Sequence, residues 1–191
     1  MEPPERYRWL RRTEFDDLAA VLWCANVSPE EVFAGFGLPP ADADHATLAD
    51  ACDPDCLDET YDDEVALLIA GALGGGAVAM LTQGFASDET MRRLSTRGPC
   101  FQAGWSDFCP PIVDYAEHGT VLFSFNYISW EFLPEPDLSA VEAWMETTPP
   151  RRSGWREFPG LAMVLTGEAI CGAVIDEAWL ARPHLVSPLN R

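Results

Sequence analysis

Cys52 and Cys56, separated by three residues and preceded by His45, are residue types at a spacing that could form half of a zinc site. A closed zinc site needs four ligands, and no second pair follows at a comparable spacing. Cys100 and Cys109 lie far apart along the chain, each beside an apolar or proline residue. Because free cysteine is among the most buried residue types, buried structural thiols are the competing interpretation, and we assign no metal ligand and no cofactor.

Carboxylates crowd the residues that follow Cys52, and their spacing invites comparison with a calcium loop. An EF-hand loop needs oxygen ligands at positions 1, 3 and 5 and a glycine at position 6. Counted from Asp53, position 3 is Asp55, but position 5 is Leu57 and position 6 is Asp58, so the motif fails. A weak, nonspecific divalent site and a solvated acidic surface both remain compatible with this run.

A nucleophile activated by a histidine is the other chemistry that the residue types allow, because such catalysis needs a thiol or hydroxyl beside a base. The candidates are Cys100, Ser106 and Cys109 with His45, His118 and His184. Nothing in their order along the chain brings them together. The motifs G-x-S-x-G, G-x-G-x-x-G and H-E-x-x-H are absent, and Gly74-Gly75-Gly76 lacks the lysine of a phosphate loop, so it predicts a turn. The sequence assigns no catalytic residue and favours a protein that is not an enzyme.

Charge narrows the range of partners. The chain has 31 acidic and 12 basic residues, a net charge of −19, and every base is an arginine. Without lysine there is no Schiff-base or other ε-amine chemistry. Nucleic acids are disfavoured because phosphate binding relies on lysine and arginine, and membranes are disfavoured for the same reason. An acidic surface attracts a basic protein partner, although simple solubility explains the same charge.

The acids concentrate in residues 41–64, which hold ten carboxylates and no arginine. We expect a solvated loop or an exposed helix there. Aromatic residues near proline-rich breaks are candidate interface anchors, although aromatics also dominate cores. The predicted partner-binding residues are Asp53, Asp55, Asp58, Glu59, Asp62, Asp63, Glu64 and Trp130. This set favours a non-enzymatic protein-binding module, in concrete form an immunity- or antitoxin-like protein that masks a basic partner.

Two other functions stay open. A small-molecule or metal-dependent enzyme would use Cys52, Cys56 or His45 at an unrecognised site. A scaffolding subunit would homo-oligomerise through Val65–Leu81, a stretch of 17 residues without charge. That stretch is at the short limit for a membrane span and glycines interrupt it, so it predicts two buried strands, Val65–Ala70 and Ala77–Thr82.

The compartment is indicated by the N-terminal residues and the cysteines. Met1 to Arg12 are charged and lack an apolar core, so they do not resemble a signal peptide. Six cysteines in 191 residues are too few for a disulfide scaffold. We therefore expect a soluble protein of a reducing, bacterial-type cytoplasm, with free thiols.

Caps, breakers and apolar periodicity predict the secondary structure. Apolar residues at helical spacing predict one helix that begins at Thr13 and continues to Trp23, and a capping box predicts a second over Ser28–Gly37. The other predicted helices begin at Ser87 and at Asp137 or Ser139, and a last one covers Leu161–Leu180. The remaining predicted strands are Cys100–Trp105, Ile112–Tyr115 and Thr120–Tyr127.

The last two strands are joined through His118-Gly119, residues that suit the positive φ angles of a tight turn. Along Thr120–Tyr127, alternation places Val121, Phe123, Phe125 and Tyr127 on one face. The whole predicts one α+β domain over residues 1–191, with an antiparallel sheet of about five strands and helices packed on one face. An acidic loop segment at 41–64 and a helical C-terminal part at 137–183 complete it.

Several short motifs resemble a family of uncharacterised actinobacterial proteins, described as a domain of unknown function, over residues 1 to about 135. The motifs are Trp23-Cys24, Ser28 to Val32 with Gly37, Gln83-Gly84-Phe85, Arg92-Arg93-Leu94-Ser95, Trp105, Tyr115-Ala116, Gly119 and Phe125. The family usually has tryptophan where this chain has Phe85. The resemblance supports the fold and implies no activity and no catalytic residue.

Overall fold

A computed structural model describes residues 5, 7–8, 18–52, 66–104, 112–126, 138–150, 154–155 and 159–189. The strands are β1 (Ala20–Ala25), β2 (Asp44–Ala46), β3 (Leu67–Leu73), β4 (Gly76–Leu81), β5 (Cys100–Gly104), β6 (Ile112–Glu117), β7 (Thr120–Asn126) and β8 (His184–Pro188). The helices are α1 (Pro29–Gly35), η3 (Pro40–Asp42), α2 (Leu48–Cys52), α3 (Asp88–Leu94), α4 (Leu138–Thr147), α6 (Pro159–Cys171) and α7 (Glu177–Leu180).

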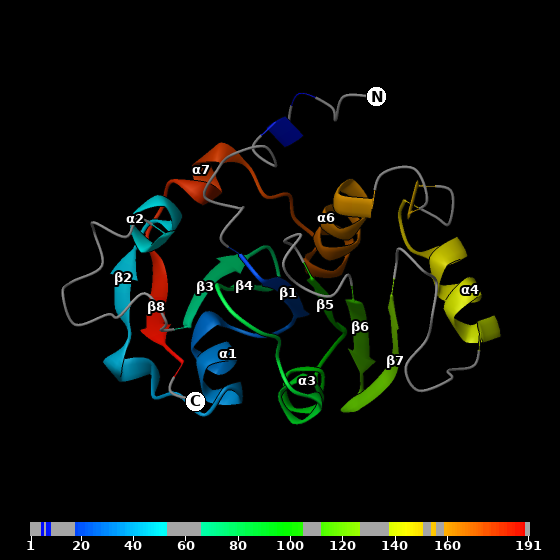
Figure 1. Ribbon diagram of the computed structural model, residues 1–191, viewed down its shortest axis with the longest axis horizontal. Coiled ribbons are helices and arrows are strands. Elements are labelled where there is room, and N and C mark those ends of the chain that lie inside the picture. The colour runs from blue at the N-terminus through cyan, green and yellow to red at the C-terminus, as the bar shows by residue number, and fades with distance from the viewer. Residues whose placement is uncertain are drawn as a thin grey trace.

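All these strands form one sheet in the order β2-β8-β3-β4-β1-β5-β6-β7, and each described pairing is antiparallel (Figure 1). The α+β class is confirmed, but the sheet has eight strands and not about five. The three strands that the sequence missed are β1, β2 and β8. Two of them, β2 and β8, make one end of the sheet.

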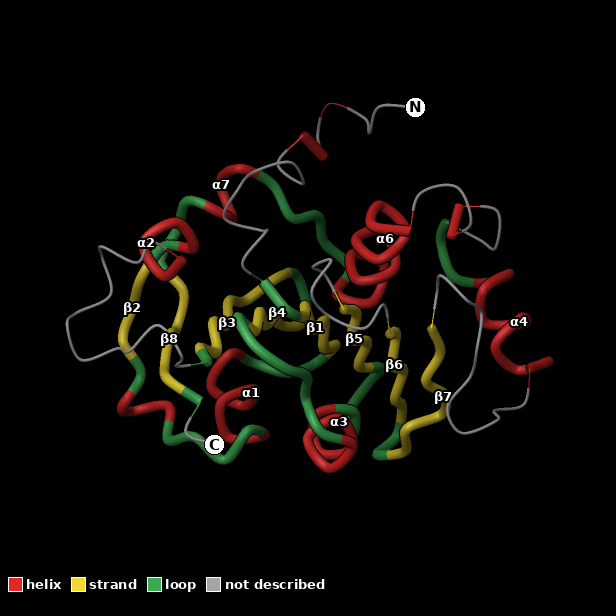
Figure 2. Tube along the Cα trace, in the orientation of Figure 1, coloured by secondary structure: helices red, strands yellow, loops and turns green. Residues whose placement is uncertain are grey.

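Helices cover both faces of the sheet, so the prediction of helices on one face is wrong. One buried cluster joins α1 and α3 to the sheet through residues such as Phe33 and Met91. A second, larger cluster on the opposite face includes residues of α2, α4, α6 and α7. Figure 2 shows α1 and α3 below the sheet and α2, α6 and α7 above it. An apolar core on each face explains why the interior strands carry few polar residues.

The chain around Trp23 is a strand, not the end of a helix. All six residues of β1 are buried, since β1 lies between β4 and β5 and has a core on each side. A strand covered on both faces reads as a continuous apolar run, and its residues fit a helical spacing equally well. Residues 13–17, where the predicted helix begins, lie outside the described residues.

The uncharged stretch that follows the acidic segment forms the antiparallel hairpin β3–β4. This confirms the prediction of two buried strands separated by glycines. Gly74 has φ of +56°, a conformation that favours glycine. Both strands are interior, and within Leu67–Leu81 only Ala72, Gly74 and Gly75 are exposed, so the protein's own sheet and helices cover this stretch. Within the described residues, no helix is both long and apolar enough to cross a bilayer.

The C-terminal part is not one helix over Leu161–Leu180. Helix α6 ends at Cys171, Gly172 follows with φ of +68°, and a separate short helix α7 is capped by Asp176, whose carboxylate accepts from the Trp179 N–H at 2.7 Å. Strand β8 then pairs with both β2 and β3. Because β2 and α2 fall within residues 41–52, the first half of the predicted acidic loop has regular structure.

Three predicted caps and turns are confirmed. Ser28 and Glu31 form the expected capping box of α1, and α3 begins after Ser87. The β6–β7 turn has positive φ at His118 (52°) and Gly119 (73°). The prediction that Val121 shares a face with Phe123 and Phe125 is wrong, because a bulge beside Tyr115 makes the register pass from Val121 to Phe123. Val121 therefore packs with the α1/α3 cluster, whereas Phe123 and Phe125 belong to the opposite one.

Candidate protein-binding surface

The predicted partner-binding residues all fall outside the part of the chain that the structure describes. These are Asp53, Asp55, Asp58, Glu59, Asp62, Asp63, Glu64 and Trp130, and Cys56 lies there too. The described acidic residues of the 41–64 segment are Asp42 in η3, Asp44 in β2 and Asp50 in α2, and all three are exposed. The start of the acidic segment is thereby placed at the β2 end of the sheet (Figure 1).

Helix α1 adds two more carboxylates at this end. Glu30 and Glu31 are exposed in its first turn. Glu30 lies close enough to His45 of β2 for an electrostatic interaction between the two side chains. The Ser28 hydroxyl holds the pKa of Glu30 below its usual value, and the Ser28 backbone N–H does the same for Glu31, with help from Arg97. Both groups therefore stay ionised. We call the five exposed carboxylates the acidic edge, and they are Glu30, Glu31, Asp42, Asp44 and Asp50.

The described arginines form few ion pairs with the carboxylates of the acidic edge. Among the described residues, only Arg97 pairs with a member of it, and that member is Glu31. The other described arginines are engaged elsewhere, as Arg8–Glu5 (3.3 Å), Arg92–Asp88 (3.5 Å), Arg93–Glu89 (3.0 Å) and Arg182 with the Ala72 carbonyl. Glu30, Asp42, Asp44 and Asp50 thus present negative charge that no described arginine neutralises.

The backbone of β2 is the outer edge of the described sheet on this side. This strand has only three residues and pairs with β8, with Asp44 opposite Val186 and Ala46 opposite His184. Short edge strands that carry charge oppose pairing with a strand from another chain. A partner that docks here is therefore expected to bind through its cationic side chains and not by adding a strand.

A second polar group lies inside the sheet, where Gln102, Asp114 and Ser124 stand opposite one another on β5, β6 and β7. The Gln102 amide N–H₂ donates to Asp114 at 2.9 Å, and its carbonyl accepts from the Ala86 N–H at 2.7 Å. Burial raises the pKa of Asp114, and hydrogen bonds from Ser124 and Gln102 oppose that rise. Because these groups satisfy one another and fix the loop before α3, the arrangement explains structure without calling for a substrate.

His184 is a buried titratable side chain on β8. It is 3% exposed, and neither ring nitrogen has a hydrogen-bond partner. Its ring lies over Gly71, where an added Cβ would come within 2.1 Å of Nδ1, and 4.3 Å from the Trp179 ring centre. Burial lowers the pKa of His184 to about 4, and the charge of Arg182 contributes while the Trp179 backbone opposes the shift. The imidazole is therefore neutral at physiological pH.

The histidines do not meet the predicted nucleophiles among the described residues. His45 and His118 are exposed, and His184 is buried on β8, whereas Cys100 contacts Cys24 and Met91 in the α1/α3 cluster. Ser106 and Cys109 lie outside the described residues. Within the described chain, no group of three His, Cys, Asp or Glu side chains could hold a metal ion, which includes His45 and Cys52.

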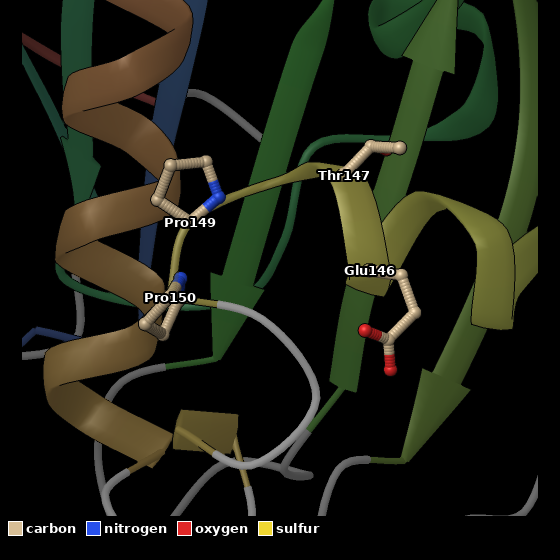
Figure 3. Close-up of a pocket in the computed structure, with 4 residues that line it drawn as sticks. All are labelled: Glu146, Thr147, Pro149 and Pro150. Carbon is tan, nitrogen blue, oxygen red and sulfur yellow. The ribbon is translucent and has the colours of Figure 1, made fainter.

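A shallow hollow of about 460 Å³ lies between the end of α4 and the start of α6. Its described lining is Glu146, Thr147, Pro149 and Pro150, shown in Figure 3. The Thr166 hydroxyl donates to the Pro149 carbonyl at 2.9 Å, which ties the segment before α6 to that helix. One exposed carboxylate and one hydroxyl do not make a nucleophile–base pair, so this hollow carries no catalytic assignment.

The sequence missed the two glutamates of α1 as members of the charged surface. Glu31 had a signal only as part of the capping box, and nothing local shows that α1 lies beside β2. His184 and the Gln102–Asp114–Ser124 row were missed because burial and cross-strand register are long-range properties. Comparisons with protein-family models, with curated proteins and with solved structures give no match. The resemblance to the actinobacterial family stays a prediction.

Proposed function

We propose that the protein is a non-enzymatic protein-binding module that docks a basic protein partner on the acidic edge and on the acids that follow it. The observation that carries the proposal is the charge of Glu30, Asp42, Asp44 and Asp50, which no arginine in the described part of the chain pairs with, beside the edge strand β2. The acids of residues 53–64 continue the same segment of the chain. Trp130 is the proposed aromatic anchor.

Electrostatics explains what such a surface contributes. Exposed carboxylates of one sign raise the rate at which a cationic protein meets the surface and repel anionic competitors. Each exposed ion pair contributes only about 0.2–1 kcal/mol, so useful affinity needs several of them together. The acidic edge and the neighbouring run supply that number. A net charge of −19 over the whole chain gives the long-range attraction.

The immunity- or antitoxin-like form of this function fits the same features. A protein that masks a cationic partner needs a rigid, acidic surface and no chemistry of its own. The sheet with helices on both faces supplies the rigid support, and the described residues bring no nucleophile and base together. A cytoplasmic location goes with this proposal.

The test is affinity capture of the tagged full chain from its native lysate at two ionic strengths. Raising the ionic strength from about 0.1 M to about 1 M shortens the Debye length from about 10 Å to about 3 Å, which screens exposed charges. The proposal expects one basic protein retained in near-stoichiometric amount at low salt and released at high salt. Retention of nothing at low salt, or of a partner that salt does not release, contradicts it.

A further inference from the structure

Two buried thiols lie opposite each other on β1 and β5, which are adjacent strands in the interior of the sheet. Cys24 of β1 and Cys100 of β5 are register partners, and their sulfur atoms are 2.9 Å apart. Both side chains are fully buried. This is a thiol–thiol contact, whereas the next sulfur, Sδ of Met91, lies 3.8 Å from the Cys100 sulfur.

The backbone around this pair suits a disulfide. The Ala25 N–H donates to the Pro99 carbonyl at 2.9 Å, so Ala25 and Pro99 are a hydrogen-bonded pair. Since the two kinds of pair alternate along an antiparallel ladder, Cys24 and Cys100 form a non-hydrogen-bonded pair. Such pairs have Cα atoms about 4.5 Å apart, within the range that a disulfide spans. Bringing the sulfurs to a bond length of about 2.05 Å needs little backbone movement.

The pair also lies near one end of the β1–β5 ladder. Cys24 is the last but one residue of β1, and Cys100 is the first residue of β5. Beyond them the Ala25–Pro99 pair closes the β1–β5 ladder, and the Asn26 side-chain N–H₂ then donates to the Arg97 carbonyl at 3.0 Å. The ends of strands separate at a lower free energy than the whole domain unfolds. Local opening of this end would give a small oxidant access to both sulfurs without global unfolding.

We propose that Cys24 and Cys100 are an oxidative modification site, at which a peroxide converts the two thiols into a disulfide that fastens β1 to β5. One sulfur attacks hydrogen peroxide and becomes a sulfenic acid, while the other peroxide oxygen leaves as hydroxide and takes up the proton of that thiol. The second sulfur then displaces the hydroxyl group from the sulfenic acid, and water leaves with its proton. Two thiols and one peroxide thus give one disulfide and two waters.

Burial controls the rate at which the two thiols are oxidised. Burial, together with the neighbouring Cys100, raises the pKa of the Cys24 thiol well above its ordinary value. The thiolate is the reactive form, so the closed protein reacts slowly and the frayed end of the ladder reacts faster. The disulfide form is expected to be more stable than the dithiol form, because the link joins residues 76 positions apart in the sequence. A loop of that length restricts the unfolded chain strongly.

The experiment treats the native full-length protein with hydrogen peroxide, alkylates the remaining thiols in denaturant, and maps disulfide-linked peptides by mass spectrometry. The same treatment of urea-unfolded protein gives the distribution expected without native geometry. We expect the Cys24–Cys100 peptide to dominate in the native sample and the melting temperature to rise by about 10 °C. A Cys24–Cys100 yield no higher than in the urea sample overturns the proposal.

Variants sharpen the result. Cys171→Ala removes a third buried thiol, whose pKa burial raises to about 12, and it should leave the link and the rise in melting temperature intact. Cys24→Ala and Cys100→Ala should each abolish both. An equal rise in Cys24→Ala overturns the assignment. If either alanine variant does not fold, the peptide map of the unaltered chain decides alone.

Discussion

Lowering the pH should destabilise the fold because His184 becomes protonated. A single substitution at this position should remove that contribution. The imidazole is 3% exposed, packs against Gly71 and Trp179, and has no hydrogen-bond partner for either nitrogen. Protonation would place a positive charge in this apolar site, close to Arg182. The substitution His184→Leu replaces the imidazole with an apolar side chain of similar size, which has no titratable group.

The magnitude follows from the pKa of His184, which burial lowers from 6.5 to about 4. A histidine with a lower pKa in the folded chain binds its proton more tightly in the unfolded chain. Its contribution to stability is therefore complete above pH 6.5 and is lost as the pH falls from 6.5 through about 4. The shift corresponds to about 3 kcal/mol of unfolding free energy.

The assay is urea denaturation, followed by tryptophan fluorescence, of both proteins at several pH values from about 7.5 to about 4. Titration of the many carboxylates changes both proteins alike, so the difference in unfolding free energy between them reports His184. We expect that difference to move by about 3 kcal/mol in favour of His184→Leu over this range. The comparison variant is His118→Asn, which removes a histidine whose side chain is 82% exposed and so shows what the loss of an exposed histidine does in the same assay. A flat difference for His184→Leu would refute the reasoning.

Three substitutions test the packing and the caps, each by the change in unfolding free energy from urea denaturation. Gly167→Ala places a Cβ 2.2 Å from the Trp23 ring and should cost at least about 2 kcal/mol, because neither α6 nor β1 can move freely; no loss would show that they do. Ser28→Ala removes the cap of α1 and should cost about 1 kcal/mol, with less than a few tenths contradicting the capping role. Tyr7→Phe removes a 2.8 Å hydrogen bond to the buried Glu168 and should cost about 1–3 kcal/mol, and an unchanged stability would mean that this bond contributes nothing.

Local hydrogen bonding explains which elements the sequence predicts well. The capping box of Ser28 and Glu31 satisfies backbone groups within four residues, so the start of α1 is readable without knowing the rest of the fold. The turn at His118 and Gly119 is equally local, since it depends on two backbone conformations. The β3–β4 hairpin is found because glycines interrupt an apolar run at Gly74.

Long-range pairing explains the errors. Strand β1 is buried on both faces, so its residues carry no alternation that separates a strand from a helix. Strand β8 is short and gains its hydrogen bonds from β2 and β3, which are far away in the sequence. The helix predicted over Leu161–Leu180 breaks at Gly172, and apolar spacing alone does not reveal that break.

The charged surface is predictable only in part. Composition alone identifies the acidic segment that contains Asp42, Asp44 and Asp50. That Glu30 and Glu31 join it depends on the position of α1 beside the β2 end of the sheet. Helix α1 packs on β3 and β4, and the pairing of β2 with β8 positions β2. The sequence shows neither of these long-range arrangements.

The most direct test of the central claim compares binding of the captured basic partner to variants of matched charge. One variant neutralises the edge with Glu30→Gln, Asp42→Asn, Asp44→Asn and Asp50→Asn. A second neutralises the run with Asp53→Asn, Asp55→Asn, Asp58→Asn and Glu59→Gln. The control neutralises exposed acids elsewhere with Glu89→Gln, Glu142→Gln, Glu146→Gln and Glu177→Gln.

The measurement is the dissociation constant of each variant by titration calorimetry at about 0.1 M salt, with urea stability as the check on folding. Our account predicts that the edge and run variants each bind roughly tenfold or more weakly, since four exposed pairs are lost, while the control changes little. Equal weakening by all three would mean that only net charge matters. Such a result, or unchanged binding by the edge and run variants, would contradict a docking surface at this end of the sheet.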